Sequence, residues 1–93
     1  MTLLSQMPKQ LKSNFEWDII TRIKEMRLQK HLSQEDIAAT LNVTRGFIGQ
    51  IETPASPSKY SLDQLNSLAR LFKCSPKDFM PEKSIKEKGD EYD

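Results

Sequence analysis

The stretch LSQEDIAATLNVTRGFIGQIE, residues 32–52, predicts two short helices joined by a tight turn. Ser33 can cap the first helix, because its hydroxyl accepts from free backbone N–H groups and Asp36 lies near the positive helix end. Asn42 tolerates the left-handed conformation that a sharp turn needs, and Thr44 can cap the second helix. The inward faces follow the helical period and consist of Ile37, Ala38, Leu41, Ile48 and Ile51.

The small side chain of Ala38 lets the two helices approach closely where they cross at the turn. Caps, turn and small residue at these offsets are typical of a helix-turn-helix, which presents its second helix to the major groove of DNA. A plain helical hairpin shares some of these features and is the alternative. The combination favours the helix-turn-helix.

The remaining chain predicts three further helices, so the fold class is all-α, a compact five-helix bundle that contains the helix-turn-helix. The first helix begins between Ser13 and Asp18, and the fourth opens at Ser61 with a capping box. Ser75 followed by Pro76 starts the last short helix.

The two ends of the chain differ from its middle. The N-terminal end has no acidic residue, and a proline interrupts its apolar pattern. The C-terminal end, EKSIKEKGDEYD, is charged and nearly free of apolar groups. We expect a flexible N-terminal arm at 1–13, a helix-turn-helix DNA-binding domain at 14–81 and a disordered charged tail at 82–93.

Residues 20–80 resemble the lambda-repressor-like, or Xre-type (Cro/CI-like), helix-turn-helix family. The resemblance implies a bundle of five short helices, commonly a dimer, that binds operator DNA. It is carried by Ile23, Met26, Arg27, Leu32-Ser33-Gln34-Glu35, Ala38, Val43-Thr44-Arg45, Ile48, Ile51-Glu52, Leu62, Leu65, Ala69, Leu71-Phe72 and Ser75 to Phe79.

The resemblance also implies roles for single residues. Gln34 is expected to contact a DNA phosphate, beside Ser33 at the same helix N-terminus. Arg27 is expected to form a partly buried salt bridge with Glu52, although both residues can instead be ordinary surface charges. The positions that face DNA in the family match Thr44, Arg45, Gly46 and Gln50.

The loop after the second helix of the motif departs from the family, because it is longer and contains two prolines. Ser58, Lys59 and Tyr60 are candidates for phosphate contacts there, and a solvated loop is an equal alternative.

The outward face of the second helix is sparse. Gly46, Gly49 and Gln50 lie at its apex, flanked by Arg45 and Phe47. Arg45 suits guanine and Gln50 suits adenine, while Phe47 can touch a thymine methyl or belong to the core. The glycines either let the backbone approach the bases closely or are simply tolerated, since each costs about 1 kcal/mol in a helix.

Composition excludes several classes of function. One cysteine and one histidine disfavour a disulfide, a metal cluster and a histidine-based triad. No nucleophile with a base and no phosphate loop is present, so we expect no enzyme, no cofactor and no metal. The chain has no long apolar run, which predicts a cytoplasmic protein without a membrane span or signal peptide.

The net charge of +1 is small for a DNA-binding domain. Attraction to phosphates must therefore come from the placement of charges and from helix N-termini at Gln34 and Thr44. A modest affinity per monomer favours a homodimer.

Three functions fit the sequence. The first is a sequence-specific transcriptional regulator that binds double-stranded DNA as a homodimer on an inverted repeat. The second is an antitoxin-like protein that also binds a protein toxin through residues 1–13 or 82–93. The third is a protein-interaction module that retains the fold without reading bases, which the two glycines and the low charge would suit.

Overall fold

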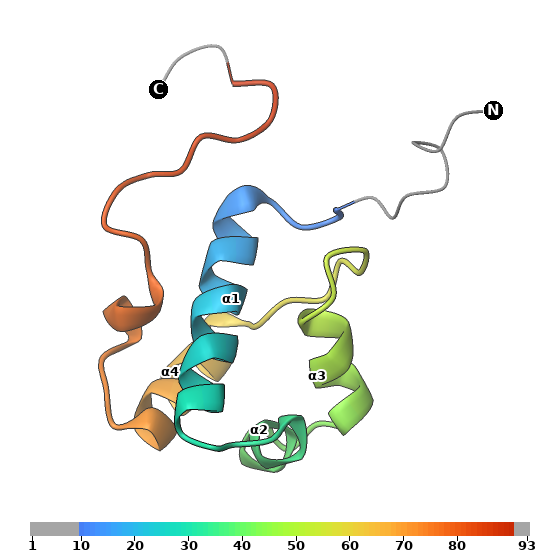
Figure 1. Cartoon of the computed structure of the whole chain (residues 1–93), viewed down its shortest axis with the longest axis vertical. Helices are drawn as coiled ribbons and strands as arrows, with labels where there is room; N and C mark the ends of the chain where they lie inside the picture. Colours follow the sequence, from blue (N-terminus) through green and yellow to red (C-terminus); the bar gives the residue numbers. More distant parts are fainter. Residues whose placement is uncertain (1–9, 91–93) are drawn as a thin grey trace, which may run out of the picture.

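The computed structural model describes residues 10–90, and this part of the chain is helical without any strand (Figure 1). Its α-helices are α1 (Asn14–Gln29), α2 (Gln34–Leu41), α3 (Arg45–Ile51) and α4 (Leu62–Phe72), followed by the 3₁₀ helix η2 (Pro76–Phe79). The fold is therefore all-α as expected.

The expectation of five α-helices was wrong, because residues 10–90 hold four and the fifth element is a single 3₁₀ turn. Met80 ends this turn with an extended backbone, φ −96° and ψ 144°. It directly precedes Pro81, whose ring disfavours the α conformation in the preceding residue. The proline thus stops the element after four residues.

Each helix begins at a hydroxyl side chain that caps it. Ser13, Ser33 and Ser61 accept from the backbone N–H three residues on, and the side chains of Glu16, Asp36 and Gln64 bond back to complete capping boxes. Thr44 caps α3 in the same way by accepting from the N–H of Phe47. Asn42 adopts the left-handed conformation with φ 58°, as its place in the turn predicted.

The core lies where α1, α2, α3 and α4 meet, and η2 closes it. The ring of Phe79 in η2 packs edge-on against Phe72 of α4, with centroids 5.9 Å apart. Ala38 of α2 is buried in this core, as expected for the small residue at the helix crossing. The largest fully buried side chains are Ile23, Ile37, Ile48, Ile51, Leu68 and Phe79.

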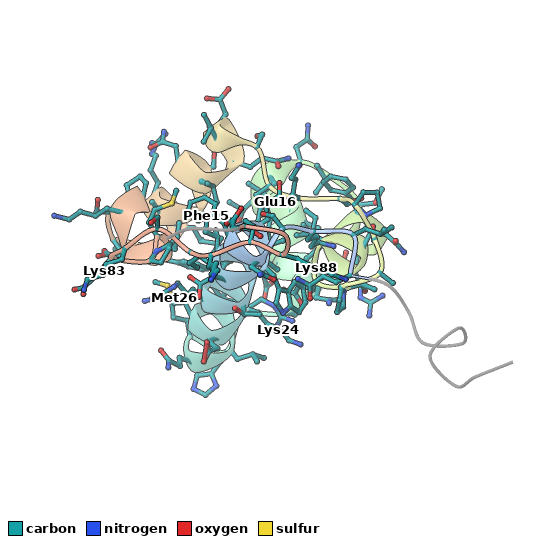
Figure 2. The ribbon with its side chains drawn as sticks, turned by 90° about the horizontal axis from the view of Figure 1, so that it is seen from above. Phe15, Glu16, Lys24, Met26, Lys83 and Lys88 are labelled. Carbon is teal, nitrogen blue, oxygen red and sulfur yellow. The ribbon has the colours of Figure 1, made fainter. Side chains whose placement is uncertain are left out.

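Segments on both sides of the helices attach to the domain. Before α1, the N–H of Leu11 donates to the Pro54 carbonyl over 2.9 Å, and Lys12 is buried. After η2, the chain returns across the N-terminal end of α1 (Figure 2). There the Glu87 carboxylate accepts from the backbone N–H groups of Asn14 and Phe15 at 2.7 and 3.0 Å.

These contacts bear on the expected arm and tail. Of the expected arm at 1–13, residues 1–9 lie outside the described part of the chain, as do residues 91–93 of the tail. Leu11, Lys12 and Ser13 belong to the folded domain. Residues 82–90 form no helix or strand, but Glu87 places its negative charge at the positive end of α1.

Candidate nucleic-acid interface

Helix α3 buries one side and exposes the other. Ile48 and Ile51 are fully buried in the core, whereas Arg45, Gly46 and Gln50 are exposed. Two of the exposed residues, Arg45 and Gln50, carry hydrogen-bonding side chains that can reach a ligand. The exposed side of α3 therefore offers one guanidinium and one amide to a partner.

Phe47 and Thr44 stand at the edge of this exposed side. Phe47 is half-buried and packs against the core, so it is both a packing residue and partly accessible. The hydroxyl oxygen of exposed Thr44 accepts from the Phe47 N–H over 3.1 Å, and its hydroxyl hydrogen can donate to another group.

Nothing in the described part of the chain requires glycine at positions 46 or 49. A Cβ added to Gly46 would lie 3.9 Å from Oγ1 of Thr44, and one added to Gly49 would lie 3.9 Å from Oε1 of Gln34. Both are ordinary van der Waals distances, and neither glycine has a positive φ. Contacts within residues 10–90 thus give no reason for either glycine.

Arg27 and Glu52, the pair that the resemblance implies, are joined by two hydrogen bonds. Nε and Nη2 of Arg27 each donate to one carboxylate oxygen over 2.8 Å. Nη1 of Arg27 donates to the Leu32 carbonyl over 3.1 Å. The pair ties α1 to the C-terminal end of α3, and its side chains are only 8% and 3% exposed.

The Glu52 carboxylate also holds Gln34. Nε2 of Gln34 donates to Oε1 of Glu52 over 2.9 Å. Burial raises the pKa of Glu52, but the hydrogen bonds from Arg27 and Gln34 outweigh it and leave that pKa below its ordinary value. Glu52 is therefore held as a carboxylate that orients a side chain at the start of α2.

The remaining phosphate candidates differ in accessibility. Ser33 is exposed, but its hydroxyl oxygen already accepts from the N–H of Asp36 over 3.0 Å. Ser58 is half-buried, and its N–H donates to Oγ of Ser56 over 3.2 Å. Lys59 is exposed and forms an ion pair with Glu16 on α1 at 2.5 Å.

The expectation that Tyr60 contacts a phosphate is corrected by its burial. Its side chain belongs to the core, and its hydroxyl is inaccessible to solvent and without a hydrogen-bond partner in the described part of the chain. Burial raises the pKa of this hydroxyl. A group so enclosed is not available to DNA.

Lys12 is a residue that the sequence pattern did not single out. Its ammonium donates to the backbone carbonyls of Gln50 over 3.2 Å, and also to those of Thr53 and Ser56. It lies 5.9 Å from the ring centre of Trp17. Burial lowers the pKa of Lys12, and Glu16 opposes this shift. Lys12 thus satisfies carbonyls where α3 ends and the following loop begins.

Neither a metal-binding cluster nor a membrane-spanning helix is found within residues 10–90. This range contains no cluster of three or more histidine, cysteine, aspartate or glutamate residues that would suit a metal ion. Among the helices described there, none is long and apolar enough to cross a membrane.

Comparison with known protein families gives a match. A sequence model of the family described as "Helix-turn-helix" matches residues 23–79, which run from the middle of α1 to the end of η2. Neither the curated proteins nor the solved structures contain a significant match to this chain.

Proposed function

The chain belongs to the Xre/lambda-repressor-like helix-turn-helix family, and we propose that it is a sequence-specific transcriptional regulator. This is a family of DNA-binding domains. In our proposal two copies bind an inverted-repeat operator, and each places the segment from Thr44 to Glu52 in the major groove.

The observation that carries the proposal is the two-sided character of α3. Its apolar side is sealed in the core, and its exposed side carries Arg45 and Gln50 on a short, capped helix. A core packed this tightly fixes the direction in which both side chains project. Base recognition needs such fixed donors and acceptors.

We assign base contacts to five residues. Arg45 donates to the O6 and N7 atoms of guanine, and Gln50 pairs with adenine through its amide. Phe47 contacts a thymine methyl with its accessible edge. Thr44 donates its hydroxyl hydrogen, and Gly46 lets the backbone of α3 come close to the base edges.

Phosphate contacts surround these residues. Gln34, oriented by Glu52 at the start of α2, is the first candidate. Ser33 lies beside it, and Ser58 and Lys59 lie on the loop after α3. Lys59 is the one charged residue of these four, but it reaches a phosphate only if it leaves Glu16, so its contribution is small.

The low net charge favours a homodimer. With a net charge of +1, one copy has little long-range attraction to DNA, and two linked copies gain affinity by binding together. The two half-sites should then be one helical turn of about 10–10.5 base pairs apart, or a multiple of it.

Selection from random duplexes, followed by salt titration of the best binder, tests the proposal. We expect one enriched inverted repeat and a negative dependence of affinity on salt. Arg45→Ala and Gln50→Ala should each reduce discrimination at one base position by roughly 1–3 kcal/mol. Arg70→Ala is the matched control for Arg45→Ala, because Arg70 is an exposed arginine on α4.

The outcomes separate specific binding from weaker roles. If Arg45→Ala and Arg70→Ala lower the affinity equally and no motif is enriched, Arg45 acts as a surface charge and the specific-regulator assignment fails. A signal with DNA that does not change with salt would show that the phosphate backbone is not contacted, and would reject the proposed mode of DNA binding.

A further inference from the structure

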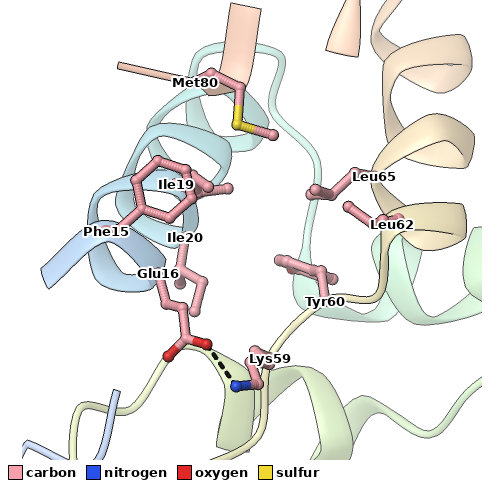
Figure 3. A pocket seen from close by; sticks show the side chains of 9 residues that line it. All are labelled: Phe15, Glu16, Ile19, Ile20, Lys59, Tyr60, Leu62, Leu65 and Met80. Carbon is pink, nitrogen blue, oxygen red and sulfur yellow. Dashed lines mark hydrogen bonds and ion pairs between the residues drawn. The ribbon is translucent and has the colours of Figure 1, made fainter. Parts of the chain in front are cut away.

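An open apolar groove lies between the N-terminal half of α1 and the start of α4 (Figure 3). Phe15 and Ile19 line it from α1, Leu62 and Leu65 line it from α4, and Met80 lies at one end. We call it the α1–α4 groove. Its volume of about 190 Å³ exceeds the roughly 150 Å³ of an apolar cavity that binds benzene. It is thus large enough to receive an apolar side chain.

A projecting leucine stands on the edge of the α1–α4 groove. Leu62 is 81% exposed, more than any other large hydrophobic residue of the described chain, and Phe15 on the opposite wall is 38% exposed. The cap of α4 does not require leucine there, because Ser61 and Gln64 form its capping box. Two exposed apolar side chains on opposite walls of an apolar groove can form the centre of a small interface.

The rim of the groove carries both signs of charge. Glu16 and Lys59 lie together at one end, paired at 2.5 Å (Figure 3). A phosphate backbone would meet a lysine that is already neutralised, and a strongly charged peptide would meet one matching and one opposing charge. A surface with the same pair of charges meets no net repulsion, because each lysine can face a glutamate.

We propose that the occupant of the α1–α4 groove is the same region of a second copy of this chain. A two-fold interface uses one patch twice, so the patch must be complementary to itself. This patch has a projecting Leu62 next to a hollow, and a cation next to an anion. In the dimer Leu62 of each copy enters the groove of the other, with Glu16 and Lys59 on the polar rim. Lys59 then pairs with carboxylates in the dimer, so in this arrangement it makes no phosphate contact.

The position of the groove agrees with the proposed homodimer on DNA, on which this inference rests. Neither Arg45 nor Gln50 lines the groove, so contacts made inside it do not use the side chains that we assign to base recognition. The α1–α4 groove is connected to α3 through Lys59 and Tyr60, which belong to the segment between α3 and α4 (Figure 1). The dimer would therefore fix the distance between the two copies of α3.

Sedimentation equilibrium of the full chain and two variants tests the interface. We expect the wild type to form a dimer and Leu62→Glu to raise its dissociation constant at least about 30-fold, the scale of a hot-spot residue. Leu28→Glu is the matched control, because Leu28 is 53% exposed near the other end of α1 and should leave the dissociation constant unchanged. Circular dichroism checks that both variants remain folded.

Disulfide trapping locates the contact directly. The native thiol is first removed with Cys74→Ser, and the single variants Phe15→Cys and Leu62→Cys are then mixed under oxidising conditions. A disulfide between the two different chains is expected, because the partner's Leu62 would lie against Phe15. If the mixture is dimeric but this product does not form, the groove assignment is wrong. A double variant, Phe15→Cys with Leu62→Cys, provides a second check: a disulfide that forms only within one chain also overturns the assignment.

DNA binding distinguishes failure of the interface from failure of the function. Leu62→Glu should bind a single half-site as the wild type does but lose the extra affinity for the full inverted repeat. The inference is overturned if Leu62→Glu dimerises fully, or if the wild type is monomeric at tens of micromolar. Half-site binding would still support the proposed function in either case. If the wild type dimerises through the groove but binds no half-site, the interface stands and the proposed function fails.

Discussion

The side-chain amide of Gln34 donates a hydrogen bond to the Glu52 carboxylate over 2.9 Å, which joins the first residue of α2 to the residue that ends α3. The same carboxylate oxygen accepts from Arg27 of α1. The amide of Gln34 has a second N–H group and an oxygen. The side chain of Gln34 is thus held beside Gly49 of α3, and its second N–H group and its oxygen remain available to a ligand.

Gln34→Ala should weaken DNA binding without changing its sequence preference. A phosphate contact carries no base information, and a hydrogen bond contributes about 1 kcal/mol, so the affinities for operator and unrelated duplex should both fall about fivefold. Fluorescence anisotropy on the two duplexes measures the ratio. Gln29→Ala, at an exposed glutamine of α1, is the control and should change neither affinity.

Glu52→Ala should strongly destabilise the fold. It leaves the buried guanidinium of Arg27 without its carboxylate, which costs about 3–5 kcal/mol of unfolding free energy. Asp18→Ala breaks the more exposed pair with Arg22 and should cost less than about 1 kcal/mol. Urea denaturation compares the two variants, and equal losses would contradict the structural importance given to the buried pair.

Acid should destabilise the protein partly through the same carboxyl. The pKa of Glu52 lies below its ordinary value of 4.5 in the folded chain, so the folded state binds fewer protons than the unfolded state there. Its contribution is fully present above pH 4.5 and is lost as the pH falls through the lowered pKa.

We expect the unfolding free energy of the wild type to decrease as the pH falls below about 4.5, and to do so less steeply in Glu52→Gln. Urea denaturation at a series of pH values measures both slopes. Glu25→Gln, an exposed glutamate of α1, provides the control. Identical slopes in wild type and Glu52→Gln would show that another group causes the loss of unfolding free energy at low pH.

Gly46→Ala should separate stability from DNA binding. The position is helical and has room for a Cβ, so alanine should raise the unfolding free energy by up to about 1 kcal/mol. If the backbone of α3 approaches the bases closely, the added methyl group should lower operator affinity about tenfold, or 1.4 kcal/mol. Thermal unfolding and anisotropy measure the two effects.

Asn66→Ala is the control for this substitution, because it improves helix propensity at an exposed position of α4. It should raise stability and leave DNA affinity unchanged. If Gly46→Ala behaves in the same way, the glycine is merely tolerated and close approach of the backbone is wrong.

The helix-turn-helix was predictable from the sequence because a cap residue and the residue that bonds back to it are only three positions apart. Ser33 with Asp36, and Ser61 with Gln64, are visible in sequence and form the capping boxes of α2 and α4. The last element was predicted as an α-helix because its N-terminal signal is equally strong. Its early end depends on Pro81 acting on Met80, which the start signal does not report.

Side chains placed by the path of a loop were not predictable in this way. Tyr60 follows a polar, proline-containing loop, a pattern that gives no sign that its ring turns into the core. Lys12 precedes a helix cap in a polar segment, and only the folded chain brings it to carbonyls about forty residues away. Both positions depend on tertiary packing rather than on a local pattern.

Lys12→Met should loosen the end of α3 without removing a contact to DNA. Methionine retains an apolar stem but leaves the carbonyls of Gln50, Thr53 and Ser56 without their shared donor, at a cost of about 1–3 kcal/mol. Amide hydrogen exchange should accelerate at residues 50–56 more than in α4. The control is Lys83→Met, at an exposed lysine after η2, which should leave the exchange rates of both regions unchanged. Operator affinity should fall while the salt slope stays constant, because a lost phosphate contact would instead reduce the slope by about 1. A reduced slope with unchanged exchange would mean that Lys12 binds DNA directly and does not position α3.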